Sequence, residues 1–240
     1  MFVKFVIVLL LLIALVSLLR GGNTSTPTAP RRSPARPLVL RIAWVLLALG
    51  LAVLAVHLSG CTPQQQPFNA TAVSAPDFGR LNALEALSDH TGSRLSRVDF
   101  SGKAVVVFFG YALCPDICPT TLATLKDVMR LLGQDAGRVQ VVFVTLDPER
   151  DTPEVIGPYV GWFDPSFRAL RGDAAATRAV AKEFKVAFSK VEGTSAAGYS
   201  LDHTATSYAY DPQGRLRLLI RHGASAEAIT ADLKKLLAGQ

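Results

Sequence analysis

Two nearly uninterrupted apolar runs, AVVVFFGY at 104–111 and VQVVFVTL at 139–146, stand out near the middle of the chain. Both are rich in β-branched and aromatic residues and neither alternates regularly, which is typical of strands buried on both faces of a sheet. Between them, Pro119 opens a segment whose apolar residues recur at helical spacing and share one face. These residues are Leu122, Leu125, Val128, Met129 and Leu132. The pattern predicts a strand, a helix and a second strand in succession.

The segments that follow alternate in the same way. We expect three helices: one capped by Thr152 or Asp151 before Pro153, one over 173–185 capped by Asp173, and one capped by Ser225 that ends at Leu237. Strands are expected at 167–170 and 186–191, and a hairpin is expected from 205–210 and 216–221. The turn sequence DPQG supports the hairpin because proline and glycine suit a tight turn. Residues 62–94 are polar and are expected to be extended, with a short helical stretch at 80–87. This order predicts an α/β sandwich whose parallel strands come first and whose antiparallel hairpin comes last.

Two further apolar runs lie near the N-terminus, at 5–19 and 42–58, and neither contains a charged residue. They are 15 and 17 residues long, slightly shorter than the about 20 residues that span a bilayer comfortably. The segment between them, 21–37, is rich in proline, serine, threonine and arginine and is expected to be a loop. Because cytoplasmic loops are enriched in arginine, the second run is expected to cross outward and to leave the chain after Cys61 on the extracytoplasmic side.

The second run ends in the sequence LSGC, which resembles a bacterial lipoprotein signal in which the cysteine, here Cys61, becomes the lipidated N-terminus. The alternative is an uncleaved transmembrane anchor that ends in a cysteine by chance. Lipoprotein signals begin close to the N-terminus, whereas 60 residues precede Cys61, a difference that a translation start near Arg36 would explain. In either case we expect residues 1–61 to be the membrane anchor or signal region, 62–75 a linker, and 76–240 one domain facing the periplasm.

The charge is divided unevenly between these regions. The 240 residues carry a formal net charge of +6, with a sequence pI of 9.4 and a mean hydropathy of +0.30. Six of the 25 cations and none of the 19 acids lie in residues 1–61, so residues 62–240 carry 19 of each and are formally neutral. The basic pI therefore describes the N-terminal region, and no nucleic-acid partner is expected, because such binding needs a basic face on the domain itself.

The chain has three cysteines, and two of them, Cys114 and Cys118, lie four residues apart just after the first predicted strand. Ligands of α/β proteins gather at the carboxyl ends of strands, and the start of the following helix favours a thiolate there. A spacing of four places both sulfurs on one side of a helical turn, with Cβ atoms about 5–6 Å apart. That separation suits a soft metal ion such as Cu(I), and a modest adjustment would instead close a disulfide. A metal site, a redox pair and a structural disulfide all remain open.

A histidine would complete a copper site with two thiolates, and the chain has four. His57 lies in the second N-terminal apolar run, His90 in the polar segment that leads into the domain, and His222 after the last predicted strand. His203 precedes the predicted hairpin, whose first strand is expected to run beside the strand that leads to the cysteines. Topology alone leaves His203 a candidate, because a lone histidine is more often a hydrogen-bonded polar residue than a ligand.

Three segments, GYALCPDICPTTL, VTLDPERDTPEVI and LDHTATSYAYDPQGRL, together resemble the Sco/SenC family in their sequence and order. The resemblance covers about residues 75–238, and no key position departs from the family pattern. It implies a thioredoxin-like three-layer sandwich with a C-terminal β-hairpin, in which Cys114, Cys118 and His203 bind copper. Family members help to deliver copper to the copper A centre of cytochrome c oxidase subunit II. Some are also proposed to reduce the cysteines of that subunit.

The resemblance also matches Asp147 and Asp151 to the acidic positions of the middle segment, and Asp116 lies between the cysteines. Ordinary turn and cap chemistry also explains Asp147 and Asp151, and for Asp151 we expect capping rather than catalysis. Asp116 is expected to order the loop or to tune the thiolates, whose formation its charge disfavours.

Two functions are consistent with these residues. The first is a non-enzymatic metallochaperone that binds Cu(I) or Cu(II), works with other copper chaperones and passes the metal to subunit II or another copper-receiving protein. The second is a thiol-disulfide oxidoreductase of the same compartment, which needs Cys114 and Cys118 but not His203. A peroxidase-like thiol enzyme would share this fold, but the cysteine motif lacks the local context that such enzymes use.

Overall fold

The computed structural model describes residues 44–51, 67–74, 76–193 and 198–240, and the chain divides into two compact units, 1–64 and 65–240. In the first unit, residues 44–51 are helical and their side chains are exposed. Among the described residues, no helix combines the length and the apolar character that crossing a membrane requires. The predicted apolar run at 5–19, most of the second run, His57 and Cys61 lie outside the described residues.

The second unit is built around a seven-stranded sheet with the strand order β1-β9-β8-β3-β4-β5-β2. Its strands are β1 (Thr71–Ala72), β2 (Ser88–Asp89), β3 (Ala104–Gly110), β4 (Val139–Thr145), β5 (Arg168–Arg171), β8 (Ser207–Tyr210) and β9 (Leu216–Ile220). Strands β3, β4 and β5 run parallel to one another, whereas the other four pair antiparallel with their neighbours. The predicted parallel strands and the C-terminal hairpin are confirmed, and the short strands β1 and β2 were not predicted.

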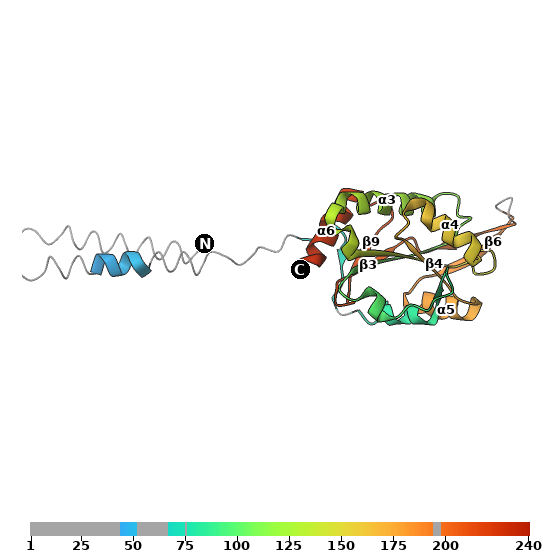
Figure 1. The fold of residues 1–240 in the computed structure, drawn as a ribbon, viewed down its shortest axis with the longest axis horizontal. Helices are drawn as coiled ribbons and strands as arrows, with labels where there is room; N and C mark the ends of the chain where they lie inside the picture. Colours follow the sequence, from blue (N-terminus) through green and yellow to red (C-terminus); the bar gives the residue numbers. More distant parts are fainter. Residues whose placement is uncertain (1–43, 52–66, 75, 194–197) are drawn as a thin grey trace, which may run out of the picture. The chain divides into compact units, whose positions relative to one another are not determined.

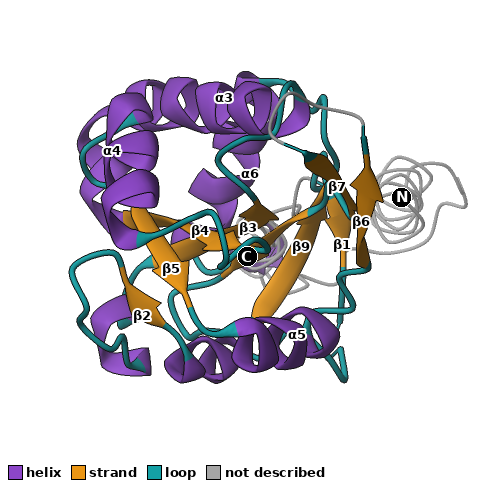
Figure 2. Ribbon diagram, turned by 90° about the vertical axis from the view of Figure 1, so that its right-hand side faces the viewer, coloured by secondary structure: helices purple, strands orange, loops and turns teal. Residues whose placement is uncertain are grey.

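Helices cover both faces of this sheet. Figures 1 and 2 show α3 (Ile117–Leu132), α4 (Pro153–Phe163) and α6 (Ala226–Leu237) on one face and α5 (Ala174–Glu183) on the other. Short 3-10 helices, η1 (Leu81–Ala86), η2 (Arg97–Phe100) and η3 (Gly133–Arg138), lie in the connections. Every residue of β3 and β4 is buried under these layers, which explains why neither strand alternates with polar residues.

The starts of the helices follow from their caps. Asp173 and Ser225 each accept a hydrogen bond from the backbone amide three residues later, as predicted for α5 and α6. Helix α3 begins at Ile117, two residues before the predicted start, because Pro119 is tolerated within the first turn. The apolar face predicted for this helix is buried and consists of Leu122, Leu125, Val128, Met129 and Leu132. Cys118 therefore lies inside the first turn of α3, on its buried side.

A second, two-stranded sheet was predicted only in part. It pairs β6 (Phe188–Glu192) antiparallel with β7 (Tyr199–His203). The sequence pattern predicts β6 but not β7, in which a single fully buried residue stands among polar and partly exposed ones. The first hairpin strand begins at Ser207 rather than at the predicted residue 205. His203 is thus the last residue of a strand that belongs to neither edge of the main sheet.

Candidate metal centre

Cys114, Cys118 and His203 come together at the carboxyl end of β3. Cys114 lies in the loop after β3, Cys118 in the first turn of α3 and His203 at the end of β7. One atom from each side chain, a sulfur or an imidazole nitrogen, lies within 4.8 Å of the other two. Cys118 is fully buried, whereas Cys114 and His203 are partly exposed. In the part of the chain that the structure describes, this is the one such group that could hold a metal ion.

The imidazole of His203 is oriented toward the cysteines. Its Nε2 lies 3.5 Å from Sγ of Cys118, and its Nδ1 lies 3.0 Å from the backbone oxygen of Thr204. Because a carbonyl oxygen only accepts hydrogen bonds, the second contact places the ring proton on Nδ1. The lone pair of Nε2 then faces the sulfur atoms, as a metal-ligating histidine requires. The rings of Phe108 and Tyr111 meet the imidazole edge-on, with centroids 6.3 and 6.0 Å away.

The two cysteines are unbridged and differ in environment. A hydrogen bond from the buried Cys118 thiol is the main cause that lowers the pKa of Cys114 to about 3. The same contact, together with burial, raises the pKa of Cys118 well above that of an ordinary thiol. The backbone amide of Cys118 also lies 3.5 Å from Sγ of Cys114. The partly exposed sulfur of Cys114 is therefore the one that ionises more readily.

The glycine at position 110 makes room for the buried sulfur. A Cβ atom on Gly110 would lie 2.7 Å from Sγ of Cys118, 3.0 Å from Cε2 of Phe143 and 3.2 Å from Cε1 of Phe108. Gly110 is not among the residues with positive φ, so available space rather than backbone conformation favours glycine here. The sequence carries no local sign of this role, because the side chain that Gly110 faces depends on how β3 and α3 pack together.

Of the two caps that the sequence predicts for α4, Thr152 occupies the cap position and Asp151 does not. The buried carboxyl of Asp151 accepts hydrogen bonds from the amide of Ala112, 3.1 Å away, and from the hydroxyl of Thr145, 2.5 Å away. Thr152 occupies the cap position of α4, without a side-chain hydrogen bond to the helix. Burial raises the pKa of Asp151. The carboxyl group thus fastens the end of β4 to the loop that carries Cys114, instead of satisfying the amides of its own helix.

The remaining candidates from the sequence lie outside the cluster. Asp116 is the exposed residue that precedes α3, and its side chain makes no capping hydrogen bond. The ring of His90 packs against a glycine of α4. Nδ1 of His222 lies 3.1 Å from a threonine hydroxyl of α3. Neither histidine joins the two cysteines, so His203 is the one that the fold brings to them within the described residues.

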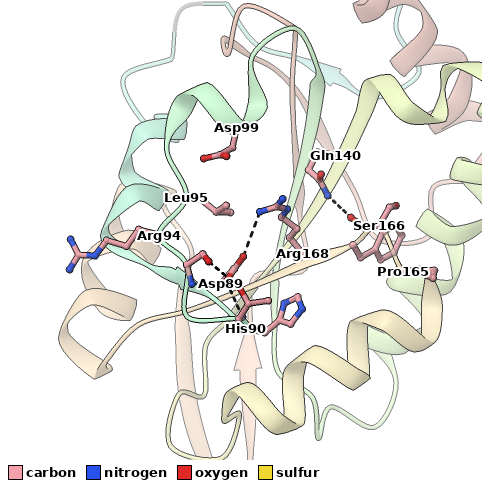
Figure 3. A pocket seen from close by; sticks show the side chains of 12 residues that line it. Asp89, His90, Arg94, Leu95, Asp99, Gln140, Pro165, Ser166 and Arg168 are labelled. Carbon is pink, nitrogen blue, oxygen red and sulfur yellow. Dashed lines mark hydrogen bonds and ion pairs between the residues drawn. The ribbon is translucent and has the colours of Figure 1, made fainter.

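A cavity of about 620 Å³ lies at the β2–β5 side of the sheet, and none of the three clustered residues lines it. Figure 3 shows Asp89 directed toward Arg168, 3.5 Å away, and Gln140 bonded to the backbone oxygen of Ser166. The other acid of the cavity, Asp99, accepts a hydrogen bond from the amide that precedes η2. Because both acids are engaged by neighbouring groups, this cavity lacks the convergent donor set of the cysteine cluster.

Comparison with known proteins places this chain in a family. The sequence profile of the SCO1/SenC family matches residues 83–238, more than half of the chain. The chain belongs to the SCO1/SenC family. A mitochondrial SCO2 homologue from Bos taurus is 32% identical over 223 residues, which cover 90% of this chain and 81% of that protein. An SCO2-like protein from Rickettsia felis is 31% identical over 179 residues, which cover 74% of this chain and 87% of that protein.

Solved structures of Sco proteins share the fold. Bradyrhizobium japonicum ScoI with copper bound is 37% identical, with a TM-score of 0.57 over 62% of this chain and 95% of that one. Arabidopsis thaliana ScoI with copper bound is 26% identical, with a TM-score of 0.62 over 69% of this chain and 100% of that one. These likenesses confirm the thioredoxin-like α/β fold. The residues that cluster, Cys114, Cys118 and His203, all lie inside the region that the SCO1/SenC profile matches.

Proposed function

We propose that this SCO1/SenC protein is a copper metallochaperone whose metal ligands are Cys114, Cys118 and His203. The observation that carries the proposal is the convergence of two sulfur atoms and one imidazole nitrogen within 4.8 Å. Thiolate and imidazole suit Cu(I), whereas carboxylate and carbonyl oxygens suit harder ions. The copper-bound structures of the Bradyrhizobium and Arabidopsis relatives support this choice of metal. Cu(II) is a second form of the cargo that the same ligands would accept.

The site is partly organised for a soft cation. His203 presents the lone pair of Nε2, because Nδ1 is held by the backbone oxygen of Thr204. Binding of the metal displaces the proton of Cys118, since the metal binds the thiolate. Cys114 and His203 are partly exposed, so a second protein can reach the cargo and exchange ligands with it.

The proposed recipient is subunit II of cytochrome c oxidase, whose copper A centre this protein would help to assemble, with other copper chaperones as partners. Support for this recipient comes from the three sequence segments that resemble the Sco/SenC family, GYALCPDICPTTL, VTLDPERDTPEVI and LDHTATSYAYDPQGRL. A different copper-receiving protein would meet the same ligands. Copper transfer from the loaded protein to purified subunit II, followed by the absorption of the copper A centre, distinguishes these recipients.

We further propose that residues 1–61 attach the protein to the bacterial cytoplasmic membrane and that the domain after them lies in the periplasm. The arginines between the two apolar runs support this orientation. Of the linker predicted at 62–75, Thr71 and Ala72 pair with β9 as strand β1, so the domain begins before residue 76. Cys61 is then either a lipid attachment site or the end of a transmembrane anchor. Labelled palmitate should enter wild-type protein but not Cys61→Ser if the cysteine is lipidated, and wild-type protein without label would overturn lipidation.

Anaerobic titration of Cu(I) into the purified protein tests the ligand set. We expect wild-type protein to bind copper tightly and His203→Ala to bind it at least about tenfold more weakly, since even residues behind a ligand contribute that much. His222→Ala is the matched control, because it makes the same substitution at a histidine outside the cluster, and it should bind copper as wild type does. Wild-type copper stoichiometry and affinity in His203→Ala would show that the three-ligand site is wrong.

A thiol-disulfide oxidoreductase is the second candidate, and the unequal cysteines favour it. The Cys114 thiolate would attack a disulfide of the copper target, forming a mixed disulfide and releasing one target thiolate. Cys118 would then attack Cys114, which releases the second target thiolate and leaves the pair oxidised. His203→Ala separates the two functions, because it should retain the rate of disulfide reduction while losing copper affinity. A reduction potential of the pair far below the potential of the compartment's reductants would argue against this role, because the oxidised pair could not be reduced again.

A further inference from the structure

The third proposed ligand is carried by a strand that the main sheet does not hold. In the described chain, β7 pairs with β6 in a separate two-stranded sheet, and His203 is its last residue. Figure 2 shows these two strands at one side of the main sheet. Backbone pairing with β3 therefore does not fix the distance from His203 to the cysteines. Side-chain contacts of β7 must contribute to that position.

Asp147, Arg150 and Tyr199 form a closed set of contacts between the loop after β4 and the start of β7. The Tyr199 hydroxyl donates to Oδ1 of Asp147 over 2.8 Å, and Nη1 of Arg150 donates to the backbone oxygen of Tyr199 over 2.9 Å. The guanidinium carbon of Arg150 lies 3.6 Å from the centroid of the Tyr199 ring. Nε of Arg150 completes the set with an ion pair to Oδ2 of Asp147. We call these three residues the β7 clamp.

The β7 clamp and the metal centre lie along the same strand. Tyr199, Leu201 and His203 occupy alternate positions, so their side chains share one face of β7. The backbone amide of Leu201 donates to the hydroxyl of Tyr111 over 3.1 Å, and Tyr111 directly follows β3. Residues 199, 201 and 203 each contact the body of the domain, Leu201 through its backbone amide and the other two through their side chains, and the last of these is the contact of His203 with Cys118.

The loop after β4, which contains Asp147 and Arg150 of the β7 clamp, also anchors the loop that carries Cys114. Asp151, the residue after Arg150, accepts a hydrogen bond from the amide of Ala112, two residues before Cys114. The side chain of Asp147 is 2% exposed and that of Arg150 is 17% exposed, so their ion pair is largely shielded from water. Breaking a shielded pair on one side leaves the other charge without its partner, which is costly. One short loop thus fixes both the cysteine loop and the histidine strand.

We propose that the β7 clamp is a positioning device that sets the copper affinity of the site by holding His203 in reach of Cys114 and Cys118. The inference rests on the proposed copper function and deepens it. None of the three clamp residues is assigned contact with the metal. They act through the backbone of β7, and their effect on copper exists only while the histidine ligand is present.

Cu(I) titration of a double-mutant cycle tests the β7 clamp. Tyr199→Phe removes the hydrogen bond to Asp147 but keeps the aromatic ring, and it should weaken Cu(I) binding by about tenfold, the lower end of the range for residues behind a metal ligand. The same substitution in a His203→Ala background should change the affinity by less than about twofold, because the clamp has no ligand left to position. An equal loss in both backgrounds, or none in the wild-type background, would overturn the proposal.

Glu149→Gln is the matched control for this cycle. It breaks the exposed ion pair between Glu149 and Lys190, which joins the same loop to β6. It removes none of the contacts among the three clamp residues, and Lys190, whose Nζ lies 4.5 Å from the centroid of the Tyr199 ring, is retained. Copper affinity should stay at the wild-type value because exposed pairs contribute little. Arg150→Lys provides a second clamp variant if Tyr199→Phe does not fold, since lysine keeps the charge but loses the planar pair of donors. If Glu149→Gln binds Cu(I) as weakly as the clamp variants do, any disturbance of this loop lowers copper affinity and the clamp has no specific role.

Hydrogen exchange of the copper-free protein separates failure of the clamp from failure of the copper function. The amides of β7 should exchange faster in Tyr199→Phe than in wild type, while those of β3 and β4 keep their protection. Suppose that wild-type protein binds no copper but the amides of β7 alone exchange faster in Tyr199→Phe. The clamp would then be retained as a structural feature, and its role in copper affinity would be overturned. Unchanged exchange in β7 would show that the clamp does not hold the strand.

Discussion

Replacing Gly110 with alanine is expected to displace the buried sulfur of Cys118. The added Cβ would lie 2.7 Å from that sulfur, whereas non-bonded heavy atoms settle at about 3.5–4.0 Å. One of the two groups must therefore move by about 1 Å. Phe143 and Phe108 close the other sides at 3.0 and 3.2 Å, and β3 is paired along both edges, so the strand has little freedom to retreat.

The size of the effect follows from the packing around that methyl group. Inserting a carbon into a well-packed core costs about 1–3 kcal/mol. Each kcal/mol lowers the Tm of a domain of about 150–250 residues by about 2–4 °C, so Gly110→Ala should lower the Tm by about 2–12 °C. Copper affinity should fall by at least about tenfold, because metal–ligand distances tolerate errors of only about 0.2 Å.

Thermal unfolding followed by circular dichroism, combined with anaerobic Cu(I) titration, measures both effects. Gly161→Ala is the matched control, because Gly161 lies inside α4 and no atom lies within 4 Å of the Cβ it would gain. Alanine is favoured over glycine inside a helix by about 1 kcal/mol, so the control should be as stable as wild type or more so. A Gly110→Ala protein with the Tm and copper affinity of wild type would refute the idea that this glycine makes room for Cys118.

Three further predictions concern the loaded protein and two buried carboxylates. Removing copper should lower the Tm measured by calorimetry, because a ligand at about 100 times its Kd raises the free energy of unfolding by about 2.7 kcal/mol. Equal Tm values for the copper-loaded and copper-free protein would contradict binding to the folded state. Asp232→Asn should speed hydrogen exchange at Asn69 and Ala70, whose amides donate to the Asp232 carboxylate over 2.9 and 2.7 Å, and unchanged exchange there would contradict that anchoring. Burial opposes ionisation of Asp211, but hydrogen bonds from Arg215 and Arg217 outweigh it and lower the pKa of Asp211 below 3.8. Asp211→Asn should therefore reduce the unfolding free energy by about 1–3 kcal/mol at pH 7, and denaturant unfolding should show this difference disappearing as the pH falls below about 4.

The elements that sequence patterns predict correctly are those with a local signal. The apolar runs of β3 and β4 reflect burial on both faces of the sheet. Predicting them requires only that helices cover both faces, and not which residues those helices contribute. Asp173 and Ser225 were predicted as caps because each bonds to an amide only three residues away. The cysteine pair belongs to the same class, since its spacing and its place after a buried strand both lie within one short segment.

The features that sequence patterns missed depend on residues far apart in the chain. Asp151 reaches the amide of Ala112, 39 residues earlier, so its local position before a proline indicated a cap instead. Tyr199 bonds to Asp147 across 52 residues, and no periodicity marks either of them. His203 has no local feature that separates it from the other histidines, and only the resemblance to the Sco/SenC family indicated it before the fold brought it 3.5 Å from Cys118.

The two functions proposed for the cysteine pair exclude each other at any one moment. Copper held by Cys114 and Cys118 occupies both sulfurs, so a loaded protein has no thiolate with which to attack a disulfide. Reduction of a target converts the pair into a disulfide, which offers no thiolate to copper until an external thiol reduces it. A molecule that serves one target in both ways must therefore reduce the target first, be reduced itself, and load copper before a second encounter. The partly exposed Cys114 fits both encounters, because it is the sulfur that a target disulfide and a copper-receiving thiolate can each reach.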